Sequence, residues 1–256
     1  MRRVHARVVL AAAVGLSWWG VGGGGAAQGA TPRILYLTQS AAFAHQVLDH
    51  SEQVLRQMAA DSSAFEVTVS RDASTLTPAR LADVAAVVFY TTGELPMDAS
   101  QKAALLAFVR GGGGFVGVHS ASDTFYEWPE YGTLVGGYFN GHPWTQEVTI
   151  RVENRTHPAT AHLGRSFRID DEIYQFRNWS RSQVDVLLSL DLASVDPTAD
   201  GIRRDDGDFA LAWTRTEGAG RVFYTALGHR PEVWDDPRFQ RHLLGGIRWA
   251  MGSDAR

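Results

Sequence analysis

The chain has 256 residues, of which 45% are hydrophobic, and its 24 basic and 28 acidic side chains give a formal net charge of −4 at pH 7. It contains no cysteine. The acidic balance argues against a nucleic-acid-binding protein, which needs a basic face, and the lack of thiols excludes disulfides, cysteine nucleophiles and thiolate metal sites.

The first thirty residues have the order of a secretory signal. A basic start is followed by an uncharged apolar run from Val8 to Val21 and then by small residues, with candidate cleavage sites after Ala27 and Ala30. A membrane anchor is the alternative, but the run is short for a span of about 20 residues. We expect residues 1–30 to be removed, which leaves residues 31–256 as a single periplasmic or secreted domain without a stable membrane anchor. Removal takes away three arginines and no acidic residue, so the formal charge changes from −4 to −7.

The N-terminal half of the mature chain alternates between strands and helices. Short apolar runs predict strands at residues 34–38, 65–69, 85–90 and 115–118. Helical patterns are expected from Phe43 to Met58, from Pro78 (capped by Thr77) to Leu81, and from a cap at Asp98 or Ser100 to Val109. This alternation predicts an α/β fold with a mostly parallel, doubly wound sheet and right-handed crossovers.

Past Thr124 the pattern changes. A short helix or ordered loop is expected over residues 128–139, followed by candidate strands at 147–152, 167–176 and 185–190, a polar surface loop at 197–207, a hairpin over 210–226, and a final helix from Asp236. The C-terminal half should therefore add antiparallel strands to the sheet. No linker separates the two halves.

One stretch presents polar side chains at the end of a buried strand. Four glycines, residues 111–114, lead into Phe115–Val118, and the apolar run ends at His119 and Ser120. In an open parallel sheet, ligands bind at this carboxyl edge. A dinucleotide fingerprint follows a strand, whereas these glycines precede one, so a nucleotide site is excluded.

Three histidines follow predicted strands and should meet at one edge of the sheet. They are His45, His119 and His229. His142, in a glycine-rich loop, can fold over the same edge. Imidazoles beside a carboxylate suit proton transfer near neutral pH or the binding of a divalent metal.

Carboxylates near these histidines in the predicted sheet are Asp123, Glu172 and Glu232. Glu172 and Tyr174 should share one face of their strand, because strand side chains alternate. A divalent metal held by His45, His119 and His142, with His229 or Glu172 as a possible further ligand, is one interpretation. Neither HExxH nor HxH spacing occurs, however, which favours a site without metal.

A serine nucleophile and a sugar-binding surface are further interpretations. Ser120 could act in a Ser–His–acid triad, but the glycines of a Gly-x-Ser-x-Gly elbow are absent around it. Flat aromatic rings near a polar pocket suit sugar rings, while filling the core is the alternative role. The candidates are Tyr126, Trp128, Tyr138, Trp144, Trp179 and Trp213, of which Tyr138 and Trp144, with His142 and Asp123, are the candidate substrate-binding residues.

An ordered set of motifs spans nearly the whole mature chain, from Arg33 to Met251. The motifs are Phe43-Ala-His45, the stretch from Gly113 to Ser120, the stretch from Gly136 to His142, His157-Pro158, the stretch from Asp171 to Tyr174, and the stretch from Gly218 to His229. As a set they resemble the ThuA-like (trehalose-utilisation) family. The resemblance implies a class I glutamine amidotransferase-like fold, a relative of flavodoxin, in which His119 stands where amidotransferases carry a cysteine. Because the chain has no cysteine, the amidotransferase reaction itself is excluded.

The resemblance also implies a carbohydrate ligand, in particular a sugar oxidised on its ring. Acid/base or elimination-type cleavage of a keto-glycoside would follow, with catalytic residues drawn from His119, His45, His229, Glu172, Tyr174 and Ser120. The alternatives are a metal-dependent hydrolase at the same histidines and a carbohydrate-binding module without catalysis. The sequence leaves the oligomeric state open.

Overall fold

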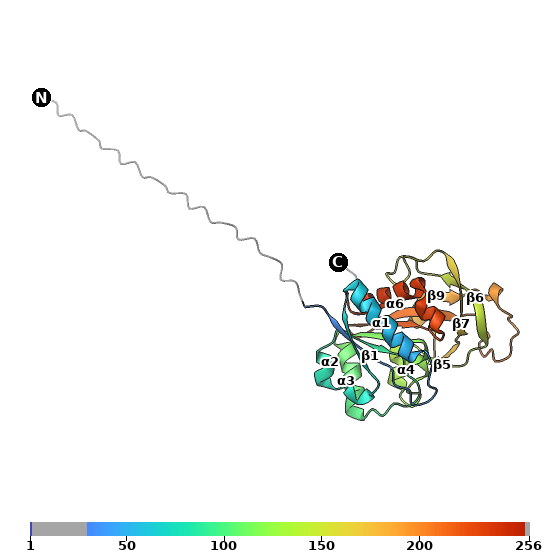
Figure 1. Cartoon of the computed structure of the whole chain (residues 1–256), viewed down its shortest axis with the longest axis horizontal. Helices are drawn as coiled ribbons and strands as arrows, with labels where there is room; N and C mark the ends of the chain where they lie inside the picture. Colours follow the sequence, from blue (N-terminus) through green and yellow to red (C-terminus); the bar gives the residue numbers. More distant parts are fainter. Residues whose placement is uncertain (2–29, 254–256) are drawn as a thin grey trace. The chain divides into compact units, whose positions relative to one another are not determined.

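A nine-stranded sheet runs through the described part of the chain, which comprises Met1 and residues 30–253 (Figure 1). The predicted signal segment lies outside the described residues except at its two ends. Five neighbouring strands are parallel. In sheet order they are β2 (Glu66–Ser70), β1 (Arg33–Leu37), β3 (Ala86–Phe89), β4 (Gly114–Val118) and β11 (Gly220–Thr225).

The C-terminal half extends this sheet with antiparallel strands. Beyond β11 the order continues with β10 (Ala210–Glu217), β9 (Asp185–Leu190), β6 (Trp144–Val152) and β7 (Ser166–Ile173). Two short strands, β5 (Tyr138–Phe139) and β8 (Phe176–Arg177), form a separate antiparallel pair. The predicted α/β fold, a mostly parallel sheet with added antiparallel strands, is confirmed.

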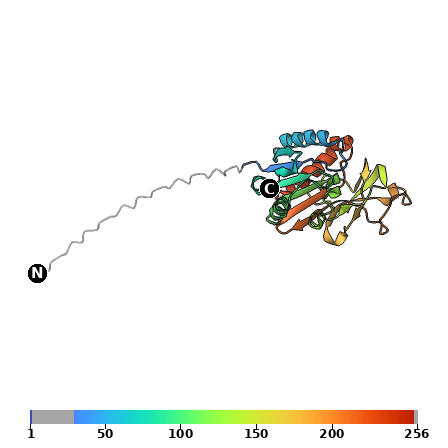
Figure 2. The same cartoon turned by 90° about the horizontal axis from the view of Figure 1, so that it is seen from below.

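Helices cover both faces of the parallel half (Figure 2). One face carries α1 (Leu48–Ser62), α5 (Pro231–Asp235) and α6 (Pro237–Ala250), and the other carries α2 (Pro78–Ala82), α3 (Ala99–Arg110) and α4 (Pro129–Val135). Short 3₁₀ helices lie at η1 (Ala73–Thr75), η2 (His119–Asp123), η3 (Arg181–Gln183) and η4 (Leu192–Ser194). No helix within residues 30–253 has both the length and the apolar character that crossing a bilayer requires.

Several helices start at the capping residues that the sequence predicted. Asp98, not Ser100, caps α3, and it forms a reciprocal capping box with Gln101. The Thr77 hydroxyl accepts from the Arg80 amide at the start of α2, and Asp236 caps α6 ahead of a first-turn proline.

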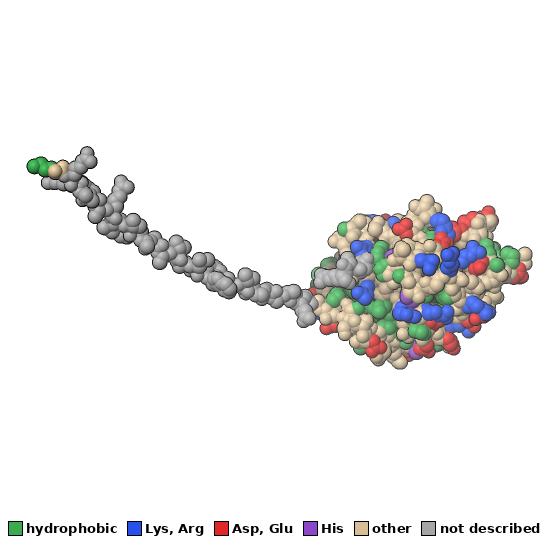
Figure 3. Space-filling view, turned by 90° about the horizontal axis from the view of Figure 1, so that it is seen from above, with side chains coloured by type: hydrophobic (Ala, Val, Ile, Leu, Met, Phe, Trp, Pro, Cys, Tyr) green, Lys and Arg blue, Asp and Glu red, His purple; other side chains and the backbone are tan. Residues whose placement is uncertain are grey.

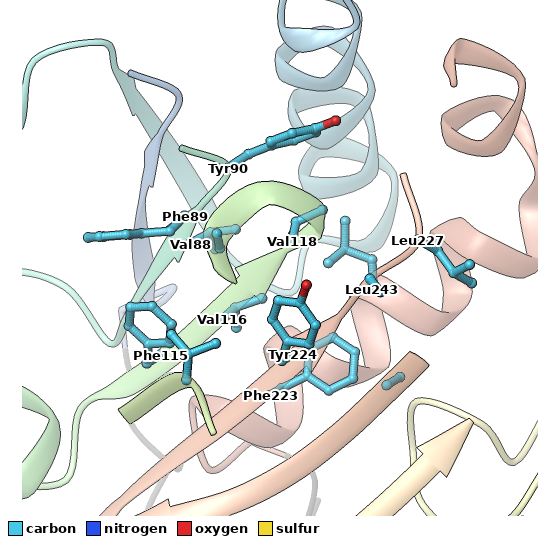
Figure 4. Packing of buried hydrophobic residues seen from close by; sticks show 14 of the residues in the cluster. Val88, Phe89, Tyr90, Phe115, Val116, Val118, Phe223, Tyr224, Leu227 and Leu243 are labelled. Carbon is cyan, nitrogen blue, oxygen red and sulfur yellow. The ribbon is translucent and has the colours of Figure 1, made fainter. Parts of the chain in front are cut away.

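The core lies between the parallel strands and the helices on either side. Figure 4 shows side chains of β4 beside those of β3 and β11, all of them shielded from solvent. Burying one such large apolar side chain contributes roughly 1.5–3 kcal/mol. Helix α6 packs closely against β11 because Gly246 has no side chain. A Cβ at this position would lie 2.3 Å from the ring of Phe223 on β11.

One local prediction is wrong, and one short helix was not predicted. Helix α1 begins at Leu48 rather than Phe43, and the side chain of Phe43 is 62% exposed. The segment before the helix is instead tied to the chain after β3, since the Thr92 hydroxyl donates to the Phe43 carbonyl and the Ala41 amide to the Thr92 carbonyl. The short helix α5 was not predicted, because five residues carry too little periodicity to be recognised.

The antiparallel half curls back over the carboxyl edge of the parallel half. In sheet order β7 lies five places from β4, yet Glu172 near the end of β7 lies 3.5 Å from His119 directly after β4. Register shifts between β9 and β10, at Ala210 to Trp213, accompany this curl. Such irregularities bend and twist a sheet.

Candidate functional site

His119 occupies a sharp turn between β4 and the 3₁₀ helix η2. Its φ of +46° lies in the left-handed region that residues other than glycine rarely adopt. Two small residues, Gly117 and Ala121, lie two positions before and two positions after His119. A Cβ on Gly117 would lie 2.8 Å from the Tyr224 ring, and the Ala121 side chain would be its next neighbour. The chain therefore has a strained elbow, Gly-x-His-x-Ala, centred on His119.

Hydrogen bonds fix the tautomer and orientation of the His119 ring, which is fully buried. Its Nδ1 lies 2.7 Å from the Ala226 carbonyl, which can only accept, so Nδ1 carries the proton. In the neutral ring Nε2 then holds a lone pair, and the Tyr174 hydroxyl donates to it across 2.9 Å. Burial raises the pKa of Tyr174, which keeps that hydroxyl protonated.

Glu172 is a half-buried carboxylate surrounded by imidazoles. Its oxygens lie 3.5 Å from His119 Nε2, 3.4 Å from His142 Nδ1 and 3.4 Å from His229 Nδ1. Burial alone would raise the pKa of Glu172, but its interactions with His119, His229 and His142 outweigh that effect and lower the pKa. The carboxylate is thus ionised in this setting.

The loop after β11 holds His229 in place. Buried Asp171 accepts hydrogen bonds from the backbone amides of Gly228 and His229, at 2.7 and 3.1 Å. The Gly228 carbonyl accepts from Tyr90 and Trp234, both at 2.9 Å. Burial raises the pKa of Asp171 to about 6, against the opposing effects of His119 and the backbone amides.

His45 packs edge-on against the other two strand-end imidazoles. Its ring centroid lies 5.0 Å from that of His119 and 5.3 Å from that of His229, and the exposed Phe43 covers it at 4.8 Å. Nδ1 of His45 is buried and has no hydrogen-bond partner among the described residues. Burial, with further contributions from His119 and His229, lowers the pKa of His45 to about 3. Burial and His119 also lower the pKa of His229.

Two cavities meet at this cluster. One, of about 440 Å³, is lined by Phe43, His45, Asp123, Phe139, His142, Glu172, Tyr174 and His229. The other, of about 570 Å³, lies between the segment from Phe43 to Val47 and the segment from His229 to Glu232. Phe43, His45 and His229 belong to both, so these three side chains stand where the cavities join.

Most of the predicted site residues are brought together, and some are not. Asp123 lines the smaller cavity and accepts a hydrogen bond from Tyr126, while burial raises its pKa. Glu232 lines only the larger one. Ser120 is fully buried beside the elbow, lines neither cavity, and its Oγ has no hydrogen-bond partner among the described residues.

Two expected sugar-binding aromatics lie away from the site. The Tyr138 hydroxyl donates to the backbone carbonyls of the turn before α4, and the Trp144 indole donates to the Asp196 carbonyl. Neither lines a cavity, because both rings fill the core.

Sequence reasoning did not single out Phe139 or Asp171 as site residues. Phe139 packs against Tyr174, with ring centroids 4.3 Å apart, and lines the smaller cavity. The motif from Asp171 to Tyr174 could have identified Asp171. Because side chains alternate along a strand, Asp171 lies on the opposite face from Glu172.

One set of three residues in the described part of the chain places its ligand atoms as a metal site requires. Single nitrogens of His45, His119 and His229 lie within 4.8 Å of one another. The predicted metal set was His45, His119 and His142, with His229 as a possible further ligand; His142 contacts the other oxygen of Glu172 and is 46% exposed.

Charged side chains of both signs are interspersed on the molecular face shown in Figure 3. Histidine side chains appear on that face only as small spots.

Comparisons with known proteins give the same family for most of the chain. The family model described as "Trehalose utilisation" (ThuA) matches residues 33–250. No curated protein sequence matches. Among solved structures, a putative ThuA-like protein from Bacteroides uniformis is 27% identical, with a TM-score of 0.71, 85% of this chain and 90% of that one covered. One from Parabacteroides merdae is 21% identical, with a TM-score of 0.72 and 88% and 92% covered.

A more distant structure shares the fold alone. The β-galactosidase from Bacillus circulans is 10% identical, with a TM-score of 0.55, and the match covers 87% of this chain but 31% of that enzyme.

Proposed function

This chain belongs to the ThuA (trehalose-utilisation) family, and from that premise we propose that it is an exported enzyme acting on a saccharide, or on a saccharide oxidised to a ketone on its ring, by histidine acid/base chemistry. The observation that carries the proposal is the placement of Glu172. One ionised carboxylate touches three imidazoles at the wall of a 440 Å³ cavity. Carboxylate–imidazole pairs of this kind move protons near neutral pH.

His142 is the imidazole best placed to act on a ligand. With its Nδ1 hydrogen directed at Glu172, its Nε2 carries the lone pair that accepts a proton. In a ring-oxidised glycoside, that proton leaves the carbon between the ketone and the glycosidic carbon. Its electron pair forms a carbon–carbon double bond, the glycosidic C–O bond breaks, and the departing oxygen takes the proton back from the imidazolium.

His119 acts through its neighbours rather than on the ligand. Its ring is fully buried and lines neither cavity. Its Nε2 accepts the hydrogen of the Tyr174 hydroxyl, which lines the smaller cavity and presents its oxygen there as an acceptor for a ligand hydroxyl. His119 is therefore a positioning residue in this proposal.

Export is part of the same proposal and rests on the residue order of the first thirty positions, a basic start, an apolar run and small residues. Expression of the full chain in a bacterium with an N-terminal sequence determined on the product tests it. A new N-terminus near Ala27 or Ala30 is expected, and an uncleaved cytoplasmic product would contradict it.

Turnover of a panel of disaccharides and their ring-oxidised forms tests the enzymatic part. We expect release of a monosaccharide from at least one oxidised glycoside, and loss of that release in Glu172→Gln and His142→Gln. The matched control is His50→Gln, since His50 pairs with Asp235 on an exposed surface. Saturable binding of a sugar without turnover would overturn the enzymatic proposal in favour of a binding module.

A further inference from the structure

We infer that His45, His119 and His229 together bind one divalent cation, with Zn²⁺ as the best-fitting ion, at the point where the two cavities meet. The inference stands on the geometry of three rings and holds whether or not the ligand is a saccharide. Three imidazoles with a further open position are a donor set that zinc takes in enzymes.

The distances between the ligand atoms fit a small cation. Zinc–nitrogen bonds of about 2.0–2.1 Å in a tetrahedron place neighbouring nitrogens about 3.3 Å apart. His119 Nε2 and His229 Nδ1 are 3.2 Å apart. The His45 nitrogen lies within 4.8 Å of both, so its ring needs a shift of about 1.5 Å, on the scale of a side-chain adjustment in a loop.

The lone pair of His119 is already directed as ligation requires. His119 donates its Nδ1 hydrogen to the Ala226 carbonyl, which leaves Nε2 as the ligand atom facing His229 Nδ1. A backbone carbonyl on the other ring nitrogen is the usual support of a metal-bound histidine.

His45 supplies an independent observation. Its side chain is 7% exposed, and its Nδ1 has no hydrogen-bond partner among the described residues. Buried polar atoms in native proteins are satisfied in the great majority of cases, and an exception calls for an ion, a water or a reactive role. A cation held jointly with the two facing rings accounts for the position of the His45 ring.

The surroundings offset the charge of the cation and keep the site rigid. Glu172 lies within 3.5 Å of two of the three ligand atoms. The His229 loop is held by Asp171, and His119 sits on the fixed elbow. A bound cation faces the 440 Å³ cavity, because His45 and His229 line it, and it can polarise a ligand carbonyl there.

Tyr174 competes with the cation for one lone pair. Its hydroxyl donates to His119 Nε2, the same atom that would bind the metal. Cation binding therefore releases the hydroxyl toward the cavity. Removing the Tyr174 hydroxyl should leave the metal affinity unchanged or increased, whereas removing a ligand should weaken it.

The test is direct metal binding by the mature protein, produced without a histidine tag and stripped with a chelator. Titration with Co²⁺, followed by visible absorption, should give one tetrahedral site per chain that Zn²⁺ displaces. His45→Gln and His229→Gln should each weaken binding at least about 100-fold. Tyr174→Phe, and the controls His50→Gln and His162→Gln, should retain it, with circular dichroism confirming that each variant is folded.

The outcomes separate this inference from the proposed function. A wild-type protein that binds neither Co²⁺ nor Zn²⁺, or a folded His45→Gln variant with wild-type affinity, overturns the cation site. Metal binding at these residues without any sugar turnover would support the site and contradict the proposed function.

Discussion

Within residues 30–253 buried histidines gather in two clusters, and the difference between them shows what marks a functional site. The edge cluster is His45, His119 and His229 around Glu172. The α6 cluster, His157, His162 and His242, joins the turn after β6 to helix α6 through backbone bonds: His242 Nδ1 to the Ala159 carbonyl at 2.9 Å and His162 Nε2 to the Arg238 carbonyl at 3.0 Å.

Burial is similar at the centres of the two clusters, since both His119 and His242 are at most 2% exposed. What differs is the group that each ring faces. Rings of the α6 cluster satisfy carbonyls and amides and so stabilise the fold. In the edge cluster His119 also bonds a backbone carbonyl, that of Ala226, but its other nitrogen and His229 face each other and a carboxylate, an arrangement that suits proton transfer or a cation.

The largest expected effect comes from removing the charge at the centre of the edge cluster. Glu172→Gln should lower kcat/KM for a ring-oxidised glycoside by about 10²–10⁴-fold, because the imidazole base loses its carboxylate partner. Steady-state kinetics measures this. If His242→Gln, in the α6 cluster, lowers kcat/KM of the folded protein by a similar factor, the functional difference between the two clusters is contradicted.

The α6 cluster should appear in the pH dependence of stability, to which the lowered pKa of His45 contributes in the same direction. Burial lowers the pKa of His242 from 6.5 to about 4. Between these values the unfolded chain binds a proton that the folded chain does not, so this contribution is complete above about pH 6.5 and is lost as the pH falls toward 4. The expected loss is up to about 3 kcal/mol.

Urea unfolding at pH 7 and pH 4.5 tests that expectation. His242→Gln should lose less unfolding free energy across this interval than the wild type does. An equally steep decline in the variant would show that the dependence arises elsewhere.

A smaller effect on both stability and activity is expected from Asp171, which connects β7 to the His229 loop. Asp171→Asn leaves one of the two backbone amides, Gly228 or His229, without an acceptor, which costs roughly 1–3 kcal/mol of unfolding free energy. Turnover should fall as well, because His229 is displaced in this variant. A variant with wild-type stability and turnover would show that the edge cluster does not depend on this support.

The smallest effect on stability is expected at Phe43. This ring is exposed but lines both cavities, so Phe43→Ala should change the unfolding free energy by less than about 0.5 kcal/mol. Because an aromatic face can stack on a sugar ring, KM should rise several-fold while kcat changes little. An unchanged KM would remove Phe43 from the binding surface.

Sequence patterns predicted the edge cluster because parallel strands impose it. Buried strands appear as short apolar runs, their carboxyl ends share one edge, and His45, His119 and His229 each follow such a run. The elbow was visible as well, once the pattern is centred on His119 with Gly117 and Ala121 on either side rather than on Ser120.

Other features depend on contacts that no local pattern contains. Tyr138 and Trp144 fill the core, whereas Phe43 and Phe139 line the cavity, and composition alone cannot tell such rings apart. The curl that brings Glu172 from the last strand of the sheet to His119 is a long-range contact, and register shifts between β9 and β10 accompany it.

The most direct test of the central claim is a crystal structure of the Glu172→Gln variant with a ring-oxidised disaccharide. The edge cluster should hold the sugar in the 440 Å³ cavity, with ligand oxygens within hydrogen-bond distance of Tyr174 and His142. A sugar bound elsewhere on the chain, with this cavity filled by solvent, would contradict the assignment of the edge cluster as the functional site.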